Sequence, residues 1–113
     1  MDPILPGEKI CDVADIADGG AFEATATLHD GTDSVILLRR GDTVDAYLNV
    51  CPHAGRRLDY APGAFLVKNA VLVCAAHGAS FAVGTGLCTA GPCRGESLRR
   101  VSVVVSNGVV TLA

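Results

Sequence analysis

Short apolar segments separated by turn-forming residues run through most of the chain. Alternating or Val-rich patterns predict strands at Glu8 to Asp12, Ala21 to Leu28, Ser34 to Arg39, Thr43 to Val50, Phe65 to Val67, Ala70 to Val73, Leu98 to Val105 and Val109 to Leu112. Turn signals stand at Asp30-Gly31, Gly41-Asp42, Lys68-Asn69 and Ser106-Asn107-Gly108. No window keeps a helical period over three turns, and Asp12 to Asp18 holds one helical turn at most. The pattern predicts an all-β domain, a sandwich or partly open barrel of short antiparallel strands.

Two stretches break this pattern, Cys51 to Gly63 and Cys74 to Arg94. Both are rich in Gly, Pro, Cys and His, and each begins directly after a predicted strand. Irregular segments mounted on a rigid β scaffold are common places for functional residues. We therefore expect these two stretches to be functional loops.

Composition and charge narrow the possible classes of protein. The chain has 113 residues, enough for one domain, and its formal net charge of −3 is too acidic for a nucleic-acid binder. The sequence has no run of about 18 apolar residues, so it predicts no membrane span. The N-terminal segment lacks the pattern of a signal peptide. We expect a cytoplasmic protein. An odd number of cysteines, five, then favours metal binding or free thiols over a disulfide framework.

A cysteine followed closely by a histidine opens each of the two loops. The first loop reads Cys51-Pro52-His53 and the second Cys74-Ala75-Ala76-His77. Two thiolates and two imidazoles make a four-ligand set suited to soft or borderline metals. Three interpretations are open: buried cysteines with surface histidines and no metal, a structural zinc site, or an iron–sulfur centre. Zinc sites more often pair Cys with Cys and His with His, whereas each loop here mixes the two.

The double motif resembles that of the Rieske ferredoxin family. Its pattern is Cys-x-His in one loop and Cys-x-x-His-Gly in the next, with a β-hairpin between them. The resemblance runs from about Leu48 to Val101 and includes Leu58, Pro62 and Gly63. Gly91-Pro92 stands where that family has a proline-bearing loop that covers the cluster.

This resemblance implies one [2Fe–2S] cluster per chain. Cys51 and Cys74 would hold the inner iron, and His53 and His77 the outer iron near the surface. It also implies a single Rieske domain over residues 1–113. In that domain a cluster-binding part of about 48–94 is inserted in a β base formed by 1–47 and 95–113.

Several positions indicate the low-potential branch of the family. High-potential members have hydroxyl donors at the places that Ala79 and Phe81 occupy here, with Ser80 one position out of register. They also have a disulfide whose cysteines are replaced here by Arg56 and Ala76. Neither the hydroxyl bonds nor that bridge can form in this chain.

The resemblance implies a monomeric carrier that passes single electrons from a flavin-dependent reductase to a terminal oxygenase, with an aromatic-ring hydroxylating dioxygenase as the expected terminal partner. We expect no catalytic residues and no enzyme activity of the chain alone. The alternative is a Rieske-fold small subunit of an assimilatory nitrite reductase, with a structural or regulatory role. Such subunits often lack the cluster ligands, whereas all four residues are present here.

The remaining candidates have simpler interpretations. We expect Cys11 to be a core residue, His29 a solvated residue beside a turn, and Cys88 and Cys93 unpaired thiols near the cluster. Three arginines in the loops, Arg56, Arg57 and Arg94, either form a positive rim that steers an acidic partner or serve only solubility.

Overall fold

The computed structural model describes residues 8–28, 31–50, 58, 65–68, 70–74, 79–91 and 95–113. Over this part of the chain the fold is all-β, as predicted, with a single short 3₁₀ turn, η1 (Val13–Asp15). The strands are β1 (Lys9–Asp12), β2 (Ala21–Leu28), β3 (Gly31–Arg40), β4 (Thr43–Leu48), β5 (Leu66–Lys68), β6 (Val71–Val73), β7 (Ser80–Ala82), β8 (Cys88–Ala90), β9 (Arg100–Val101), β10 (Val103–Ser106) and β11 (Val109–Leu112). No helix in the described ranges is long and apolar enough to cross a bilayer.

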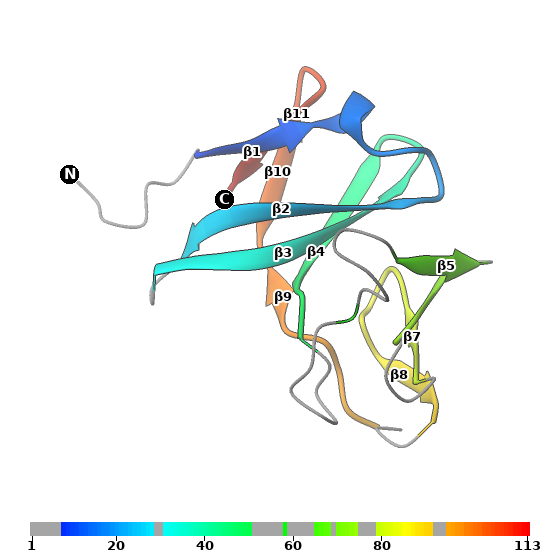
Figure 1. The fold of residues 1–113 in the computed structure, drawn as a ribbon. Coiled ribbons are helices and arrows are strands. Elements are labelled where there is room, and N and C mark those ends of the chain that lie inside the picture. The colour runs from blue at the N-terminus through cyan, green and yellow to red at the C-terminus, as the bar shows by residue number, and fades with distance from the viewer. Residues whose placement is uncertain are drawn as a thin grey trace.

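The strands form three antiparallel sheets (Figure 1). One sheet has the order β1-β11-β10 and the second β2-β3-β4-β9, and together we call them the base. The third has the order β5-β6-β7-β8, and we call it the small sheet. Figure 1 shows the small sheet at the lower right. The strands β2, β3 and β4 lie between it and the strands β1 and β11.

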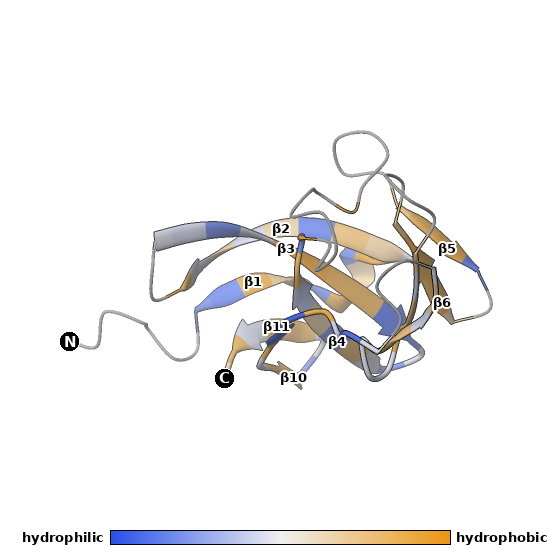
Figure 2. Ribbon diagram, turned by 90° about the horizontal axis from the view of Figure 1, so that it is seen from below, coloured by the Kyte–Doolittle hydropathy of each residue, from blue (hydrophilic) through white to orange (hydrophobic). Residues whose placement is uncertain are grey.

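Two hydrophobic cores separate these layers, and β3 contributes to both. Val35 and Leu37 pack in the core between the two sheets of the base. Ile36 and Leu38, which alternate with them, pack in the core between the base and the small sheet. Successive strand residues point to opposite faces, so this four-residue apolar run is fully buried. Figure 2 shows an orange stretch of β3 followed by a blue end.

Tight turns connect the strands of the base. Arg40 pairs with Thr43 around the predicted Gly41-Asp42 turn, where Gly41 has a φ of 62°. Ser106 pairs with Val109 around Asn107 and Gly108, whose φ values are 52° and 76°. Positive φ at both central residues, as at Asn107 and Gly108, is what a two-residue type I′ hairpin requires. In the Gly41-Asp42 turn Gly41 alone has a positive φ. The flanking residue pairs confirm both turn predictions.

The structure corrects three details of the predicted elements. Gly31 pairs with Leu28 in the β2–β3 ladder and is the first residue of β3 rather than part of a turn. The hairpin between β5 and β6 turns one residue later than the predicted Lys68-Asn69, because Lys68 pairs with Val71. The predicted strand Leu98 to Val105 is two strands that belong to different sheets, β9 beside β4 and β10 beside β11.

Two strands of the small sheet were not predicted. β7 and β8 lie within the stretch from Cys74 to Arg94 that the sequence suggests is a loop. Each has three residues, too few for an alternating pattern to stand out among the surrounding glycines. The pairs Leu72↔Phe81 and Phe81↔Cys88 place these side chains in one row across the sheet, and all three are buried against the base.

Candidate functional site

Of the four predicted ligands, the structure describes Cys74. Cys51, His53 and His77 lie outside the described residues. Cys74 directly follows β6, and its side chain is 1% exposed in the core between the base and the small sheet. Its backbone N–H donates a hydrogen bond to the carbonyl of Ala79 at 2.7 Å. This bond brings together the two ends of the segment that carries His77.

The segment that carries Cys51 and His53 also has its ends held together. Asn49 follows β4, and its Oδ1 accepts a hydrogen bond from the backbone N–H of Leu58 at 2.8 Å. Leu58 is fully buried in the same core as Cys74. Both predicted ligand segments therefore start and end against one hydrophobic core, although one leaves the base and the other leaves the small sheet.

A third segment passes close to Ala79. Gly91 directly follows β8 and has a φ of 99°, and a Cβ placed on it would lie 2.7 Å from the Cα of Ala79. Only glycine allows the backbone to approach so closely. The predicted covering loop, of which Pro92 lies outside the described residues, therefore starts beside the second ligand segment.

The positions that indicate the low-potential branch lie in this core. Ala79 and Phe81 are both fully buried together with Cys74, and neither side chain has a hydroxyl group. Ser80 lies between them on β7, so its side chain points to the opposite face of the small sheet. Ser80 therefore does not replace the missing donors.

A network of polar side chains joins the base to the turn after β7. The hydroxyl of Tyr47 donates to the carbonyl of Val83 at 2.7 Å. Arg100 donates to the Tyr47 hydroxyl at 3.0 Å and to the carbonyl of Gly84 at 2.6 Å. Asp45 accepts from Arg100 at 3.1 Å. We call Asp45, Tyr47 and Arg100, with these two carbonyls, the clasp.

The clasp is tightly packed. The guanidinium carbon of Arg100 lies 5.1 Å from the centre of the Tyr47 ring, and a Cβ on Gly86 would lie 2.7 Å from that ring. Burial raises the pKa of Tyr47 above its usual value, against the lowering effect of the nearby Arg100. The phenol therefore stays protonated and donates its hydrogen bond at neutral pH. No sequence motif marked these residues.

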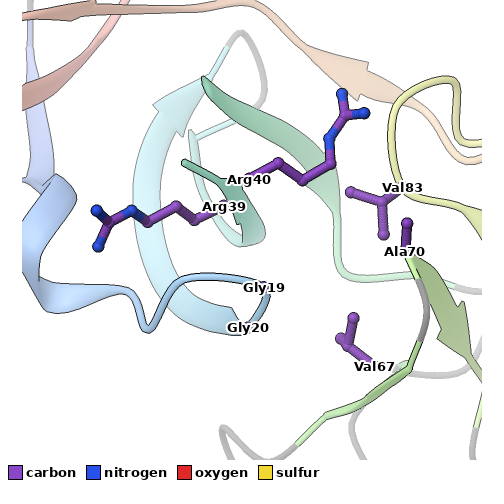
Figure 3. Close-up of a pocket in the computed structure, with 7 residues that line it drawn as sticks. All are labelled: Gly19, Gly20, Arg39, Arg40, Val67, Ala70 and Val83. Atoms are coloured by element: carbon purple, nitrogen blue, oxygen red, sulfur yellow. The ribbon is translucent and has the colours of Figure 1, made fainter. Parts of the chain in front are cut away.

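A small cavity of about 80 Å³ lies beside the clasp, lined by residues of both the base and the small sheet (Figure 3). Figure 3 shows Arg39 and Arg40 extending in opposite directions from β3. Arg39 donates to the carbonyl of Ile16 and Arg40 to Asp45, so both guanidinium groups have partners within the chain. The cavity is too small for an organic cofactor.

The remaining cysteines and His29 are placed as follows. Cys11 is a buried core residue, as expected, and burial, with Asp15 and Asp12 nearby, raises the pKa of its thiol to about 11. Cys88 is buried beside Phe81, and its thiol lies 3.2 Å from the carbonyl of Ala90. Cys93 and His29 lie outside the described residues.

Comparisons with known proteins agree with this geometry. The sequence matches the Rieske [2Fe-2S] domain over residues 8–107. The ferredoxin of carbazole 1,9a-dioxygenase from Nocardioides aromaticivorans IC177 is 32% identical, with a TM-score of 0.72 over 96% of this chain and 97% of that one. A chain in the complex of reduced oxygenase and oxidized ferredoxin in carbazole 1,9a-dioxygenase is 26% identical, with a TM-score of 0.76 over 99% and 94% of the two chains. The ferredoxin of Sphingomonas yanoikuyae B1, at 22% identity and a TM-score of 0.72 over 94% and 96%, shares the fold. No curated protein sequence gives a significant match.

The chain belongs to the Rieske [2Fe-2S] domain family. Within that family it is a Rieske ferredoxin similar to those of carbazole 1,9a-dioxygenase, and the class carries electrons rather than converting a substrate. Family membership implies a [2Fe–2S] cluster. The described residues fit such a group, because a buried cysteine follows β6, both ligand segments have their ends at one core, and Gly91 lets a third segment approach.

Proposed function

We propose that the protein accepts single electrons from a flavin-dependent reductase and delivers them to a terminal oxygenase, an aromatic-ring hydroxylating dioxygenase. The observation that carries the proposal is similarity over nearly the whole chain to a ferredoxin of a carbazole dioxygenase and to a chain of an oxygenase–ferredoxin complex. We further propose that the carrier is a monomer and acts in the cytoplasm, where a reducing environment keeps thiolate ligands available.

We propose that Cys51, His53, Cys74 and His77 hold the cluster, with the two cysteines on the inner iron and the two histidines on the outer iron. The described position of Cys74 supports this, since a thiolate there would be shielded from water by the surrounding apolar side chains. Neutral imidazoles in place of two thiolates leave such a cluster less negative and easier to reduce by one electron. We also propose that residues 48–94 form the cluster-binding part and that 1–47 and 95–113 form its support.

The ligand set is tested by substitution and metal analysis. Purified protein should be red-brown and contain two irons and two sulfides. Cys51→Ala, His53→Ala, Cys74→Ala and His77→Ala should each abolish or severely reduce the visible absorbance, whereas His29→Ala should leave it unchanged. Zinc in place of iron would contradict the cluster. Loss of colour in His29→Ala but not in His77→Ala would contradict the ligand set.

The carrier role is tested by electron transfer. Protein reduced by a flavin-dependent reductase should be reoxidised rapidly when a carbazole-type terminal oxygenase is added, as followed by stopped-flow absorbance. Colourless protein that co-purifies with a nitrite reductase would instead support the alternative of a structural subunit.

A further inference from the structure

Asn49 is one of two buried residues with an amide or carboxylate side chain in the described part of the chain, and it is 2% exposed. The other, Asp45, belongs to the clasp. Asn49 makes two kinds of contact. Its backbone N–H and its Nδ2 donate to the carbonyl and Oγ of Ser34 on β3, at 3.0 and 3.2 Å. Its Oδ1 accepts from the backbone N–H of Leu58 at 2.8 Å.

The orientation of the Asn49 amide is fixed by a chain of donors. The hydroxyl of Ser34 donates to Oε2 of Glu23 at 2.6 Å, so it presents its lone pairs to the Nδ2 of Asn49. The Leu58 N–H in turn requires an acceptor, which is Oδ1. A rotation of the amide by 180° would place donor against donor and acceptor against acceptor. Only one orientation therefore satisfies both neighbours.

This side chain joins the two ends of one segment. Residues 50–57 lie between Asn49 and Leu58 in the sequence, and they contain Cys51 two positions after Asn49. Leu58 is fully buried, so its N–H has no access to water and would lack a partner without the amide. A single buried contact thus joins the two residues that flank this segment, Asn49 and Leu58.

We propose that Asn49 is a positioning residue for the segment that carries Cys51 and His53, so that both reach the cluster in one geometry. The proposal rests on the ligand set proposed above. Its readout is the cluster itself, because partners behind metal ligands typically change metal affinity 10- to 100-fold when they are removed.

Three single variants of the cluster-loaded protein provide the test. Asn49→Leu keeps a similar volume but removes both side-chain contacts. Ser34→Ala removes the support of the amide and keeps the contact with Leu58. Tyr47→Phe is the matched control, since it removes a buried hydrogen bond two residues before Asn49, on β4, but at the clasp.

Three measurements are made on each variant: the rate of cluster loss to an iron chelator, the EPR spectrum of the reduced protein and the midpoint of thermal unfolding. Asn49→Leu should lose its cluster at least about tenfold faster than the wild type and show shifted EPR g values. The rate of cluster loss from Ser34→Ala should lie between the rates of the wild type and Asn49→Leu, and so should the shift of its EPR g values. Tyr47→Phe should lower the unfolding midpoint but leave the EPR spectrum unchanged.

Two results together overturn the proposal. The EPR spectrum of Asn49→Leu is unchanged, and its cluster loss is no faster than that of Tyr47→Phe when the two variants have similarly lowered unfolding midpoints. If Asn49→Leu gives no folded protein, wild-type cluster loss and EPR in Ser34→Ala overturn it. Failure of the ligand set is distinguished by His53→Ala, which would then keep its cluster whatever the Asn49 variants do.

Discussion

The base and the small sheet are held together in different ways. In the base, β2 and β3 pair over eight consecutive positions and β3 and β4 over six. In the small sheet each strand has three residues. Among the described residues, one face of the small sheet packs against a core, and base residues such as Ile36 and Tyr47 supply part of that core. The base can therefore stabilise itself, whereas the small sheet depends on its neighbours.

This difference suits a protein that holds a group between two parts of its fold. One ligand segment leaves β4 of the base and the other leaves β6 of the small sheet. A cluster bound by both would connect the two parts, and so would the clasp. The comparison thus predicts that changes at this connection affect the small sheet first.

The largest expected effect follows from removal of the cluster. Extraction of iron with a chelator should expose amides of β5–β8 to hydrogen exchange, while amides of β2, β3 and β4 stay protected. A ligand at a hundredfold its Kd stabilises a protein by about 2.7 kcal/mol, so local opening of the small sheet should become easier by at least about 2 kcal/mol. Equal loss of protection in β3 and β6 would contradict the comparison.

The second effect concerns the reduction potential. The buried Ala79 and Phe81 offer no hydroxyl donors, so the potential should lie near the low end of the Rieske range, roughly −150 mV. Ala79→Ser with Phe81→Tyr should raise it, because a hydrogen bond to a charged acceptor favours the more negative, reduced state. A hydrogen bond to a charged group contributes about 1.5–3 kcal/mol at most. For a one-electron couple about 1.4 kcal/mol corresponds to about 59 mV, so each bond should raise the potential by on the order of 50–100 mV.

Protein-film voltammetry measures this change, and Ser80→Ala on the opposite face of the small sheet is the matched control. Ser80→Ala should leave the potential nearly unchanged. A wild-type potential above about +150 mV would contradict the low-potential branch. No shift in the double variant would mean that the two side chains do not face the cluster.

Much of the fold could be predicted from the sequence where local patterns are strong. The apolar run of β3, the Gly41 turn and the Asn107-Gly108 turn are each predicted by a pattern of only a few consecutive residues. The division of Leu98 to Val105 between two sheets could not be predicted, because no Gly or Pro marks the break at Ser102. The break arises because β9 pairs with β4 and β10 pairs with β11. The local sequence does not show these pairings, since β4 lies far earlier in the chain and β11 follows later.

The site was partly predictable for a related reason. A cysteine and a histidine two or three positions apart form a recognisable motif, and the structure describes Cys74 at a segment end where the motif places it. The clasp carries no such motif, since Tyr47 and Arg100 are 53 positions apart. Asn49 resembles an ordinary loop residue until its burial and its contact with Leu58 are known.

The third effect tests the clasp as a connection between the two parts. Tyr47→Phe removes the hydroxyl that donates to Val83 and accepts from Arg100, so it should lower the free energy of unfolding by about 1 kcal/mol. Urea denaturation measures this loss. Hydrogen exchange should show it first at the amide of Val83, which donates to the carbonyl of Ala70. A Thr111→Val variant in the base, whose hydroxyl makes only a long, exposed bond of 3.5 Å, should change stability by a few tenths of a kcal/mol at most.

The smallest effect compares two turns. Gly41, between β3 and β4, has a φ of 62°, and Ala70, between β5 and β6, has a φ of 61°. A side chain in this left-handed conformation costs roughly 1–2 kcal/mol. Ala70→Gly should remove that cost, partly offset by greater freedom of the unfolded chain, and raise the free energy of unfolding by about 0.5 kcal/mol.

Gly41→Ala is the matched opposite change. A Cβ on Gly41 would meet no atom within 4 Å, so only the backbone conformation opposes it, and the free energy of unfolding should fall by about 1 kcal/mol. Thermal or urea denaturation of both variants gives the comparison. If Ala70→Gly destabilised the protein instead, the methyl group that lines the small cavity would contribute more than the turn costs. The β5–β6 turn would then stabilise the small sheet through its packing against the base.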